Sequence, residues 1–285
     1  MPGPHPYPLE PKVSMPDSAT RFRALHSRFL VMPNPWDAGT AKLLANLGFE
    51  AIATSSAGLA WSDARPDGHV TRKRAIAHAV EIATATGLPV NGDFESGYGE
   101  TPAEVADTIL AAIDAGVAGC SVEDLAHDRP EPLYDVHMAA RRIEAARDTI
   151  DRSGSDFVLT GRTEVFFTDL PDKLSIAVER LKAYAAAGAH VVYAPGLTRE
   201  EEVAAIVDAV DVPVNVIAGL GGVSDDLAKL EALGVTRISL GSNLMKVAIG
   251  AFLDAATALK AGRVALPDMV SSASMNAAFA PRPRS

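Results

Sequence analysis

The chain has 285 residues and a formal net charge of −10, with 48% hydrophobic and 22% charged residues. This balance is typical of a globular protein with a sizeable core, built as one large α/β domain or two small ones. The negative charge disfavours nucleic acid or an anionic membrane as a partner, and no apolar run reaches the ~20 residues that a membrane span needs. The single cysteine, Cys120, excludes an intrachain disulfide, so we expect a reducing, cytoplasmic location.

The two ends of the chain differ in composition from its middle. Residues 1–18 are rich in proline and lack an apolar signal core, so we expect a flexible N-terminal tail. Residues 19–262 are expected to form the catalytic domain, and residues 263–285 a C-terminal extension.

Within this domain, short apolar runs alternate with alanine-rich and leucine-rich segments that often end at glycine. Strands are expected at residues 29–33, 50–56, 88–93, 119–124, 157–162, 190–195, 214–218 and 237–241, with loops from the second strand to 71 and from the fourth to 134. Helices are expected at residues 18–26, 36–48, 72–86, 101–115, 135–153, 174–187, 199–210, 225–233 and 243–261. Eight strand–helix units predict a (β/α)8 barrel, because a doubly wound sheet usually has only about five or six strands.

Two carboxylates follow the third strand, at Asp93 and Glu95, before a glycine-rich turn at 97–99. Side chains two residues apart in a strand project to the same side, so these two should leave the strand together. Close carboxylates repel each other unless they share a proton or hold a cation. Oxygen ligands suit Mg²⁺ or Mn²⁺ better than zinc. The alternative is a solvated acidic loop near a helix start.

In a (β/α)8 barrel the chemistry lies where the strands end, at the C-terminal rim. Glu123 ends the neighbouring fourth strand, so it can converge with Asp93 and Glu95 on one cation. Arg162 ends the fifth strand, and its rigid fork suits either a substrate carboxylate or a salt bridge to the acidic cluster. The backbone at Ser55, Ser56 and Ala57 offers N–H groups to an oxyanion, or forms a simple turn.

These residues lie in an ordered set of motifs that resembles the phosphoenolpyruvate mutase/isocitrate lyase superfamily over residues 21–261. The motifs are Asp93-x-Glu95-Ser-Gly-Tyr-Gly99, Ser121-Val-Glu123-Asp124 and Gly161-Arg162-Thr163-Glu164. The resemblance implies a (β/α)8 barrel whose last helix is swapped between subunits, in a homodimer or a dimer of dimers, with one Mg²⁺ (or Mn²⁺) at the rim.

The resemblance also implies roles for individual residues. Asp93 is the expected direct metal ligand, with Glu95 and Glu123 holding the metal directly or through water. Arg162 is the expected clamp for a substrate carboxylate. Further matches are Asp67 in Arg65-Pro-Asp67-Gly68 as an additional acidic residue, the turn of Ser55, Ser56 and Ala57 as an oxyanion site, and Asn215 as a seventh-strand substrate contact.

The chain also departs from the family pattern. Glu95 stands where many members have the shorter aspartate. Members that cleave isocitrate or methylisocitrate carry a cysteine and lysine on the loop after strand four, but the loop at 125–134 has neither. Cys120 lies three residues before Glu123, so it should face the helices instead. His127, as an acid, and Arg129, as an anion clamp, are the loop's candidates, unless they are simply solvated.

Of these reactions, decarboxylation depends least on the loop residues that this chain lacks. The expected function is therefore a lyase or decarboxylase that cleaves a C–C bond in a small 2-oxo or 2-hydroxy carboxylic acid with the help of the metal. The alternatives are C–P chemistry, as a phosphoenolpyruvate/phosphonopyruvate mutase or phosphonopyruvate hydrolase, and a non-catalytic barrel that binds a metabolite. The apolar helix at 244–259 is too apolar to face water on all sides, which supports a homodimer or homotetramer.

Overall fold

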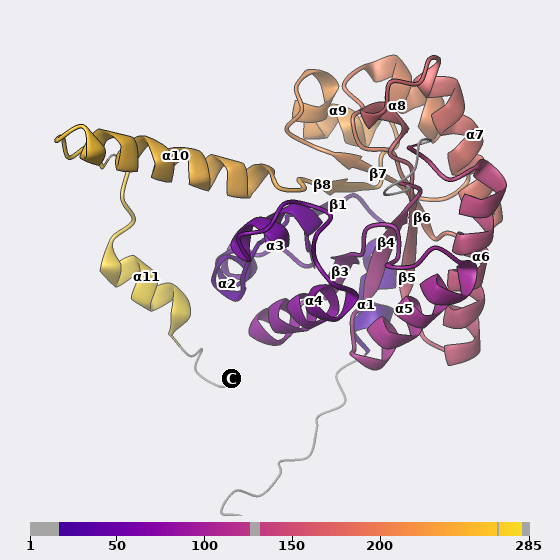
Figure 1. The fold of residues 1–285 in the computed structure, drawn as a ribbon, viewed down its shortest axis with the longest axis horizontal. Helices are drawn as coiled ribbons and strands as arrows, with labels where there is room; N and C mark the ends of the chain where they lie inside the picture. Colours follow the sequence, from indigo (N-terminus) through magenta and orange to yellow (C-terminus); the bar gives the residue numbers. More distant parts are fainter. Residues whose placement is uncertain (1–16, 126–131, 267, 281–285) are drawn as a thin grey trace, which may run out of the picture.

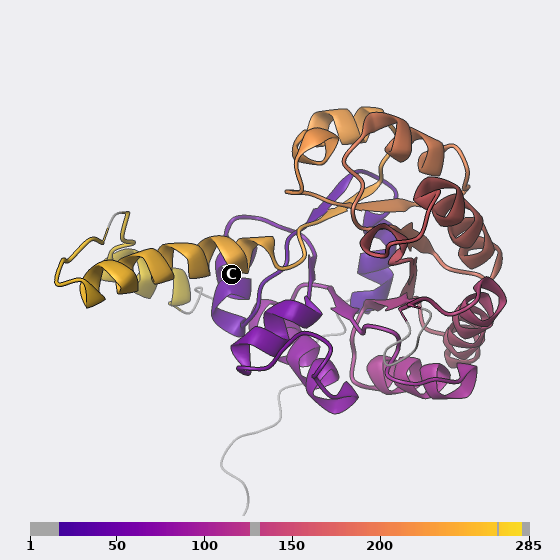
Figure 2. The same ribbon diagram turned by 45° about the horizontal axis from the view of Figure 1, so that its top comes forward.

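The computed structural model describes residues 17–125, 132–266 and 268–280. Its strands and helices alternate along the chain, and the helices surround the strands (Figures 1 and 2). In this part of the chain no helix is long and apolar enough to cross a membrane.

Eight strands form one parallel sheet in the order β1-β8-β7-β6-β5-β4-β3-β2. The strands are β1 (Leu30–Met32), β2 (Ile52–Ala53), β3 (Val90–Asp93), β4 (Gly119–Glu123), β5 (Val158–Arg162), β6 (Val191–Tyr193), β7 (Val214–Ile217) and β8 (Arg237–Ser239). The two end strands meet where the Ala53 N–H donates to the Pro33 carbonyl at 3.1 Å. The predicted (β/α)8 barrel is therefore confirmed, nearly closed between β1 and β2.

Helices follow the strands. They are α1 (Ser18–Leu25), α2 (Ala38–Asn46), α3 (Ser56–Ser62), α4 (Arg72–Thr86), α5 (Pro102–Asp114), α6 (Val136–Ser153), α7 (Lys173–Ala186), α8 (Glu200–Val207), α9 (Leu227–Ala232), α10 (Asn243–Lys260) and α11 (Ser272–Phe279), with short 3₁₀ turns η1 (Val165–Phe167) and η2 (Gly222–Asp225). Local signals set their ends: α5 begins with a capping box between Thr101 and Glu104, and α4 ends at the left-handed Gly87.

Two helices were not expected from the sequence. The segment after the second strand was predicted as a loop to residue 71, but it contains α3, whose first turn is capped by the Ser55 side chain. Residues 272–279 form α11 within the predicted extension. Both helices have eight residues or fewer, which is too short to show a clear helical periodicity.

The N-terminal end of the barrel is closed by α1. Phe22 of α1 is fully buried against the first residues of three strands, Leu30, Val158 and Val191. The opposite, C-terminal end is left for the strand-end side chains and the loops that follow them.

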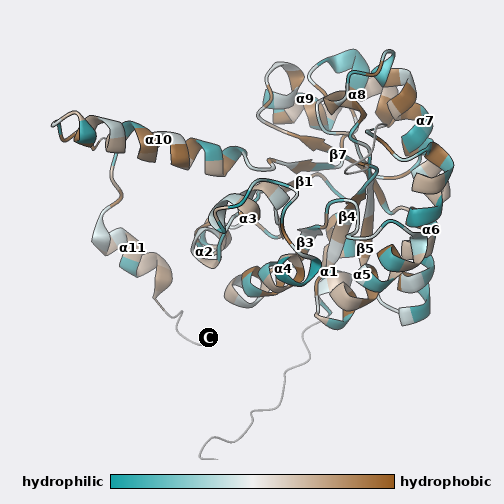
Figure 3. Cartoon of the chain, in the orientation of Figure 1, coloured by the Kyte–Doolittle hydropathy of each residue, from teal (hydrophilic) through white to brown (hydrophobic). Residues whose placement is uncertain are grey.

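The C-terminal helices leave the barrel. Figure 1 shows α10 running outward from β8, with α11 turning back below it. The Asn46 side chain of α2 donates to the Ala278 carbonyl of α11 at 2.7 Å. The hydropathy colouring shows apolar residues along the projecting α10 (Figure 3).

Candidate active site

Three ionisable side chains end neighbouring strands, at Asp93 of β3, Glu123 of β4 and Arg162 of β5. The register of β4 on β5 places Glu123 directly beside Arg162. Arg162 Nη1 donates to Asp93 Oδ1 at 3.3 Å, and Arg162 Nε lies 3.3 Å from Glu123 Oε2. The rim thus brings together the three side chains that their positions at strand ends predicted.

A fourth charged group, Glu164, joins this cluster. Its carboxylate pairs with Arg162 Nε, two residues back along the chain. Burial alone would lower the pKa of Arg162, but Glu164, Glu123 and Asp93 raise it well above its usual value. Arg162 therefore stays charged. The sequence offered a signal for Glu164, because residues two apart at a strand end face the same way, but no role was assigned to it.

Asp124 holds Glu164 in place through a network of buried hydrogen bonds. Its Oδ1 accepts the Glu164 N–H at 2.9 Å, while its Oδ2 accepts Arg180 Nη1 at 2.9 Å and the Tyr184 hydroxyl at 2.5 Å. All of these groups are buried. The network fixes the backbone just beyond Arg162, and with it the position of Glu164.

The predicted oxyanion turn lies against Asp93. The Ser56 N–H donates to Asp93 Oδ2 at 3.0 Å, and the Ser121 hydroxyl to Asp93 Oδ1 at 3.3 Å. The Ser55 side chain accepts the Gly58 N–H at 3.2 Å, so Ser55 acts as the N-cap of α3. Ala57 is the second residue of that helix. The turn therefore reaches the predicted site, although the Ser56 N–H already binds a carboxylate of this chain.

Glu95 lies in the loop after β3, in an unusual backbone conformation. Its φ is 48°, in the left-handed region that residues other than glycine rarely adopt. Its carbonyl accepts the Glu123 N–H at 2.9 Å, and its side chain accepts the Tyr98 hydroxyl at 3.4 Å. Glu95 and Glu123 are thus neighbours, and Glu95 is buried at the rim.

The loop from Glu95 to Glu100 is held by one side chain of α6. Arg142 Nη1 donates to the Gly99 carbonyl at 2.7 Å and to the Glu100 carbonyl at 2.6 Å, and Nη2 donates to the Ser96 carbonyl. Gly99 also has no room for a side chain, since a Cβ there would lie 2.2 Å from Glu104 Cβ. The strained loop is therefore fixed by contacts from residues far along the sequence.

The acidic groups influence one another electrostatically. Burial, followed by the charges of Asp93 and Asp67, raises the pKa of Glu95 to about 7. Asp67 lies in the exposed loop before α4, where its Oδ1 accepts the Gly68 N–H at 3.1 Å. Its negative charge therefore adds to that of the rim, and its assignment as an additional acidic residue of the site stays a prediction.

The donor set fits a divalent cation in its chemistry. Asp93, Glu95 and Glu123 offer hard carboxylate oxygens, and a cation would offset the repulsion and burial that raise the pKa of Glu95. Within the described ranges, however, no three His, Cys, Asp or Glu side chains are grouped closely enough to hold a metal ion. Arg162 bridges Asp93 and Glu123 instead. The metal-ligand assignment therefore remains a prediction.

A small cavity of about 40 Å³ adjoins Asp93 and Arg162. Its other lining residues come from β3 and from six further strands or strand ends: Met32, Asn34, Ala53, Thr54, Asn91, Ser121, Tyr193, Asn215, Arg237, Ser239 and Gly241. Asn215, the predicted substrate contact, is buried there. Its Nδ2 donates to Ser239 Oγ at 3.0 Å and its Oδ1 accepts Arg237 Nε at 2.8 Å. It thus lines the cavity but is bonded within the barrel.

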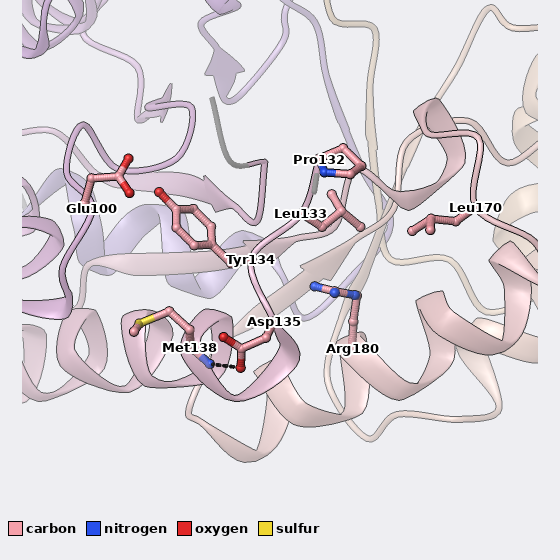
Figure 4. Close-up of a pocket in the computed structure, with 8 residues that line it drawn as sticks. All are labelled: Glu100, Pro132, Leu133, Tyr134, Asp135, Met138, Leu170 and Arg180. Carbon is pink, nitrogen blue, oxygen red and sulfur yellow. Dashed lines mark hydrogen bonds between the residues drawn. The ribbon is translucent and has the colours of Figure 1, made fainter. Parts of the chain in front are cut away.

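A larger hollow of about 530 Å³ lies outside this cluster (Figure 4). Glu100 lies at one side of the view and Leu170 at the other, with Tyr134, Leu133 and Arg180 between them. None of the strand-end carboxylates lines this hollow. The chemistry of the rim therefore points to the smaller cavity as the reaction site.

Two predictions concern the fourth strand and its loop. His127 and Arg129 lie outside the described residues, so their roles stay predictions. Cys120 is fully buried in the hydrophobic core, together with helix residues such as Ile109 and Ala146, and burial raises the pKa of its thiol. The prediction that Cys120 faces the helices rather than the pocket is confirmed.

Comparison with known proteins agrees with this site. Residues 22–260 match the phosphoenolpyruvate phosphomutase family. A solved Burkholderia cenocepacia J2315 protein, described provisionally as a lyase or mutase, is 44% identical, with a TM-score of 0.88 over 93% of this chain and 96% of that protein. The 2,3-dimethylmalate lyase of Eubacterium barkeri is 33% identical over 86% of each chain.

Two further similarities cover much of the chain. The oxaloacetate decarboxylase of Paraburkholderia xenovorans is 31% identical over 83% of this chain and 80% of its own. A solved 2,3-dimethylmalate lyase, described as a member of the phosphoenolpyruvate mutase/isocitrate lyase superfamily, has a TM-score of 0.83 over 93% of this chain and 96% of its own. These matches favour an enzyme over a non-catalytic barrel. The chain belongs to the phosphoenolpyruvate mutase/isocitrate lyase superfamily and is a lyase of that type.

Proposed function

We propose that the protein cleaves a carbon–carbon bond in a small 2-oxo or 2-hydroxy carboxylic acid, with Mg²⁺ or Mn²⁺ held by Asp93, Glu95 and Glu123. The observation that carries this proposal is the convergence of the partly buried Asp93 and the buried Glu123 and Glu164 on the charged guanidinium of Arg162. When bound, the cation supplies Lewis-acid stabilisation of the negative charge that develops on a substrate oxygen.

Arg162 is suited to orient the substrate. Its Nε and Nη1 pair with carboxylates of the chain, whereas its Nη2 makes no hydrogen bond to the residues that the structure describes. That edge of the guanidinium is available for a substrate carboxylate, and the Glu164 and Asp124 contacts hold it in place. Pre-oriented charge of this kind lowers the barrier without rearrangement during the reaction.

Two forms of the reaction are candidates: loss of CO₂ and retro-aldol cleavage. The absence of a cysteine and a lysine from the loop at 125–134 favours loss of CO₂, which needs fewer proton transfers from that loop. The similarity to an oxaloacetate decarboxylase supports loss of CO₂. The similarity to a 2,3-dimethylmalate lyase supports retro-aldol cleavage.

A second candidate is cleavage or rearrangement of a C–P bond in phosphonopyruvate. It is supported by the match of residues 22–260 to the phosphoenolpyruvate phosphomutase family. The same metal site and arginine would serve this chemistry, so only the substrate distinguishes it.

The test is to incubate the Mg²⁺-loaded protein with oxaloacetate, 2,3-dimethylmalate, 2-methylisocitrate and phosphonopyruvate, and to measure pyruvate, glyoxylate and phosphate. We expect turnover of at least one carboxylic acid by the wild type and none by Asp93→Ala. Turnover of phosphonopyruvate alone, to pyruvate and phosphate or to phosphoenolpyruvate, would favour the C–P candidate. No turnover of any substrate, or equal rates for both proteins, would reject the proposed function.

A further inference from the structure

Tyr193 is a buried phenol beside the carboxylate cluster. It ends β6, where the strand register places it beside Arg162 of β5 and Asn215 of β7. It is 7% exposed, and the guanidinium carbon of Arg162 lies 5.3 Å from the centre of its ring. Tyr193 also lines the cavity of about 40 Å³ that Asp93 and Arg162 adjoin. Its side chain is therefore at the proposed reaction site.

A row of hydrogen bonds behind Tyr193 runs in a fixed direction. Arg237, the first residue of β8, can only donate, and its Nε donates to Asn215 Oδ1 at 2.8 Å. This contact fixes which end of the Asn215 amide is the donor, and its Nδ2 donates to Ser239 Oγ at 3.0 Å. Arg237 is itself held by Thr160, whose Oγ1 accepts from its Nη2 at 2.9 Å. The row therefore makes Ser239 an acceptor from Asn215.

The same direction continues from Ser239 to the phenol. The Ser239 side chain is hydrogen-bonded to the Tyr193 side chain. Because Ser239 Oγ accepts from Asn215, its own proton is available for the Tyr193 oxygen. Tyr193 then keeps its phenolic proton for another partner. Among the described residues its hydroxyl bonds to no second side chain, so the proton is directed toward the cavity that the ring lines.

Tyr193 therefore has the properties of a proton donor. Burial raises the pKa of its hydroxyl, so the phenol is protonated at neutral pH, whereas Arg162 and the Ser239 contact favour the phenolate. Both forms of the proposed reaction leave an electron pair on carbon, and that carbon must take up a proton. The loop at 125–134 has no cysteine or lysine to supply it.

We propose that Tyr193 is the general acid of the reaction and protonates the carbon from which CO₂ or the other fragment departs. This rests on the proposed function, because that cleavage produces the enolate. The phenolic O–H bond breaks, and its proton forms a C–H bond with the electron pair of the enolate carbon. The phenolate left behind takes a proton from water after the product leaves. Ser239 and Arg237 are positioning residues that act through the phenol.

The experiment measures by NMR the exchange of the methyl protons of pyruvate with D₂O in the presence of the Mg²⁺-loaded protein. Exchange removes and returns a proton at carbon, so it reports the proton transfer without C–C cleavage. We expect the wild type to exceed the rate with Mg²⁺ alone. Tyr193→Phe should reduce this protein-dependent rate by about 10²–10⁴-fold, as loss of a general acid typically does. Ser239→Ala keeps the phenol but removes its orienting donor, so it should cause a smaller loss.

Calorimetry with oxalate separates proton transfer from binding. Oxalate resembles the enolate of pyruvate in charge and shape but has no carbon to protonate. Tyr193→Phe should therefore bind oxalate within about threefold of the wild type, because the phenolic proton is needed only for the chemical step. The matched variant Tyr134→Phe removes a similarly buried hydroxyl outside the cavity lining, so it should keep the wild-type exchange rate and oxalate affinity.

The outcomes distinguish the proton donor from the proposed reaction. Tyr193 is rejected as the acid if the wild type exchanges no faster than Mg²⁺ alone, if Tyr193→Phe exchanges like the wild type, or if its oxalate affinity falls as far as its exchange rate. Normal exchange in Tyr193→Phe with a loss in His127→Ala would assign the proton to the loop instead. Exchange that depends on Tyr193, without turnover of any substrate in the panel above, would reject the proposed reaction and leave the proton transfer.

Discussion

At the scale of single residues, the Asp93 carboxylate accepts three hydrogen bonds in the candidate site. It accepts bonds from Arg162, Ser56 and Ser121, and it is the carboxylate expected to bind the metal directly. Asp93→Ala removes one of three anionic ligands, so we expect Mg²⁺ affinity measured by calorimetry to fall at least about tenfold, and metal-dependent activity to be lost. Asp151→Ala, on the surface of α6, should bind Mg²⁺ like the wild type. Unchanged affinity in Asp93→Ala would show that the ligand assignment is wrong.

A Cys120→Ser variant tests the prediction that the reaction does not use a thiol. Its side chain is buried among core residues and outside the cavity lining. We expect Cys120→Ser to keep kcat within a few-fold of the wild type, while a newly buried hydroxyl lowers the free energy of unfolding by about 1–3 kcal/mol.

Steady-state kinetics and urea unfolding on the same preparation measure both effects of Cys120→Ser. A large loss of kcat in protein that remains folded would mean that the thiol takes part in catalysis. Mechanisms of the cysteine-dependent lyases would then have to be reconsidered for this chain.

At the scale of elements, Arg142 ties the loop after β3 to helix α6. Its guanidinium donates hydrogen bonds to the backbone carbonyls of Ser96, Gly99 and Glu100. Arg142→Met should lower the free energy of unfolding by about 1–3 kcal/mol, because the buried Ser96 carbonyl would lose its hydrogen-bond donor. It should also weaken Mg²⁺ binding, since the same loop begins at Glu95.

Chemical unfolding and calorimetry test the Arg142 prediction. Arg141→Met is the matched control, because Arg141 is the exposed neighbour on the same helix. Equal stability of the two variants would show that the carbonyl contacts of Arg142 contribute little.

His190, just before β6, is a pH-sensitive group that lies between an arginine of α1 and an arginine of α6. Two guanidinium groups lie beside its Nε2, that of Arg23 in α1 at 2.9 Å and that of Arg147 in α6 at 2.6 Å. Both disfavour the protonated form of His190, whereas the carboxylates of Asp151 and Asp156 favour it. Burial, then Arg23 and Arg147, lowers the pKa of His190 to about 4. Between pH 6.5 and 4 the unfolded chain therefore binds more protons than the folded one. The stability that the neutral His190 contributes is fully present above pH 6.5 and is lost as the pH falls toward 4.

Unfolding measured from pH 7 to pH 4.5 should show this loss, with a slope that approaches about 1.4 kcal/mol per pH unit for one such histidine. His190→Gln should reduce the slope, and His137→Gln, on the exposed face of α6, should not. His26 also has a pKa lowered, to about 3, by burial and Arg237, so part of the slope should remain. An identical slope in His190→Gln would exclude the histidine as its source.

At the scale of the whole molecule, the sequence predicted what depends on local pattern. Strand ends, helix caps and two-residue spacing are local, and they located Asp93, Glu123 and Arg162 at one rim. The contacts of Arg142 and Arg237 span 42–46 and 22–211 residues, respectively, and no local pattern encodes them. Short elements such as α3 were missed for a related reason. Seven residues held by a single serine cap carry too little periodicity to distinguish from a loop.

The arrangement of the whole chain predicts its assembly. Helix α10 projects from the barrel with large apolar side chains in solvent, with Val247 73%, Phe252 68% and Leu259 65% exposed. Burial of such a side chain is worth about 1.5–3 kcal/mol, so a second copy that covers α10 would stabilise the assembly. We expect at least a homodimer, with the C-terminal helices exchanged between subunits.

Light scattering at micromolar concentration should give a mass of two or more chains for the wild type. Phe252→Glu with Leu253→Glu places two charges on the apolar surface of α10, so it should shift the mass toward a monomer. Phe167→Glu replaces an equally exposed aromatic residue on η1, away from α10, and should keep the wild-type mass. A wild type that runs as a monomer, or a Phe167→Glu variant that dissociates while the α10 variant does not, would place the interface elsewhere or exclude it.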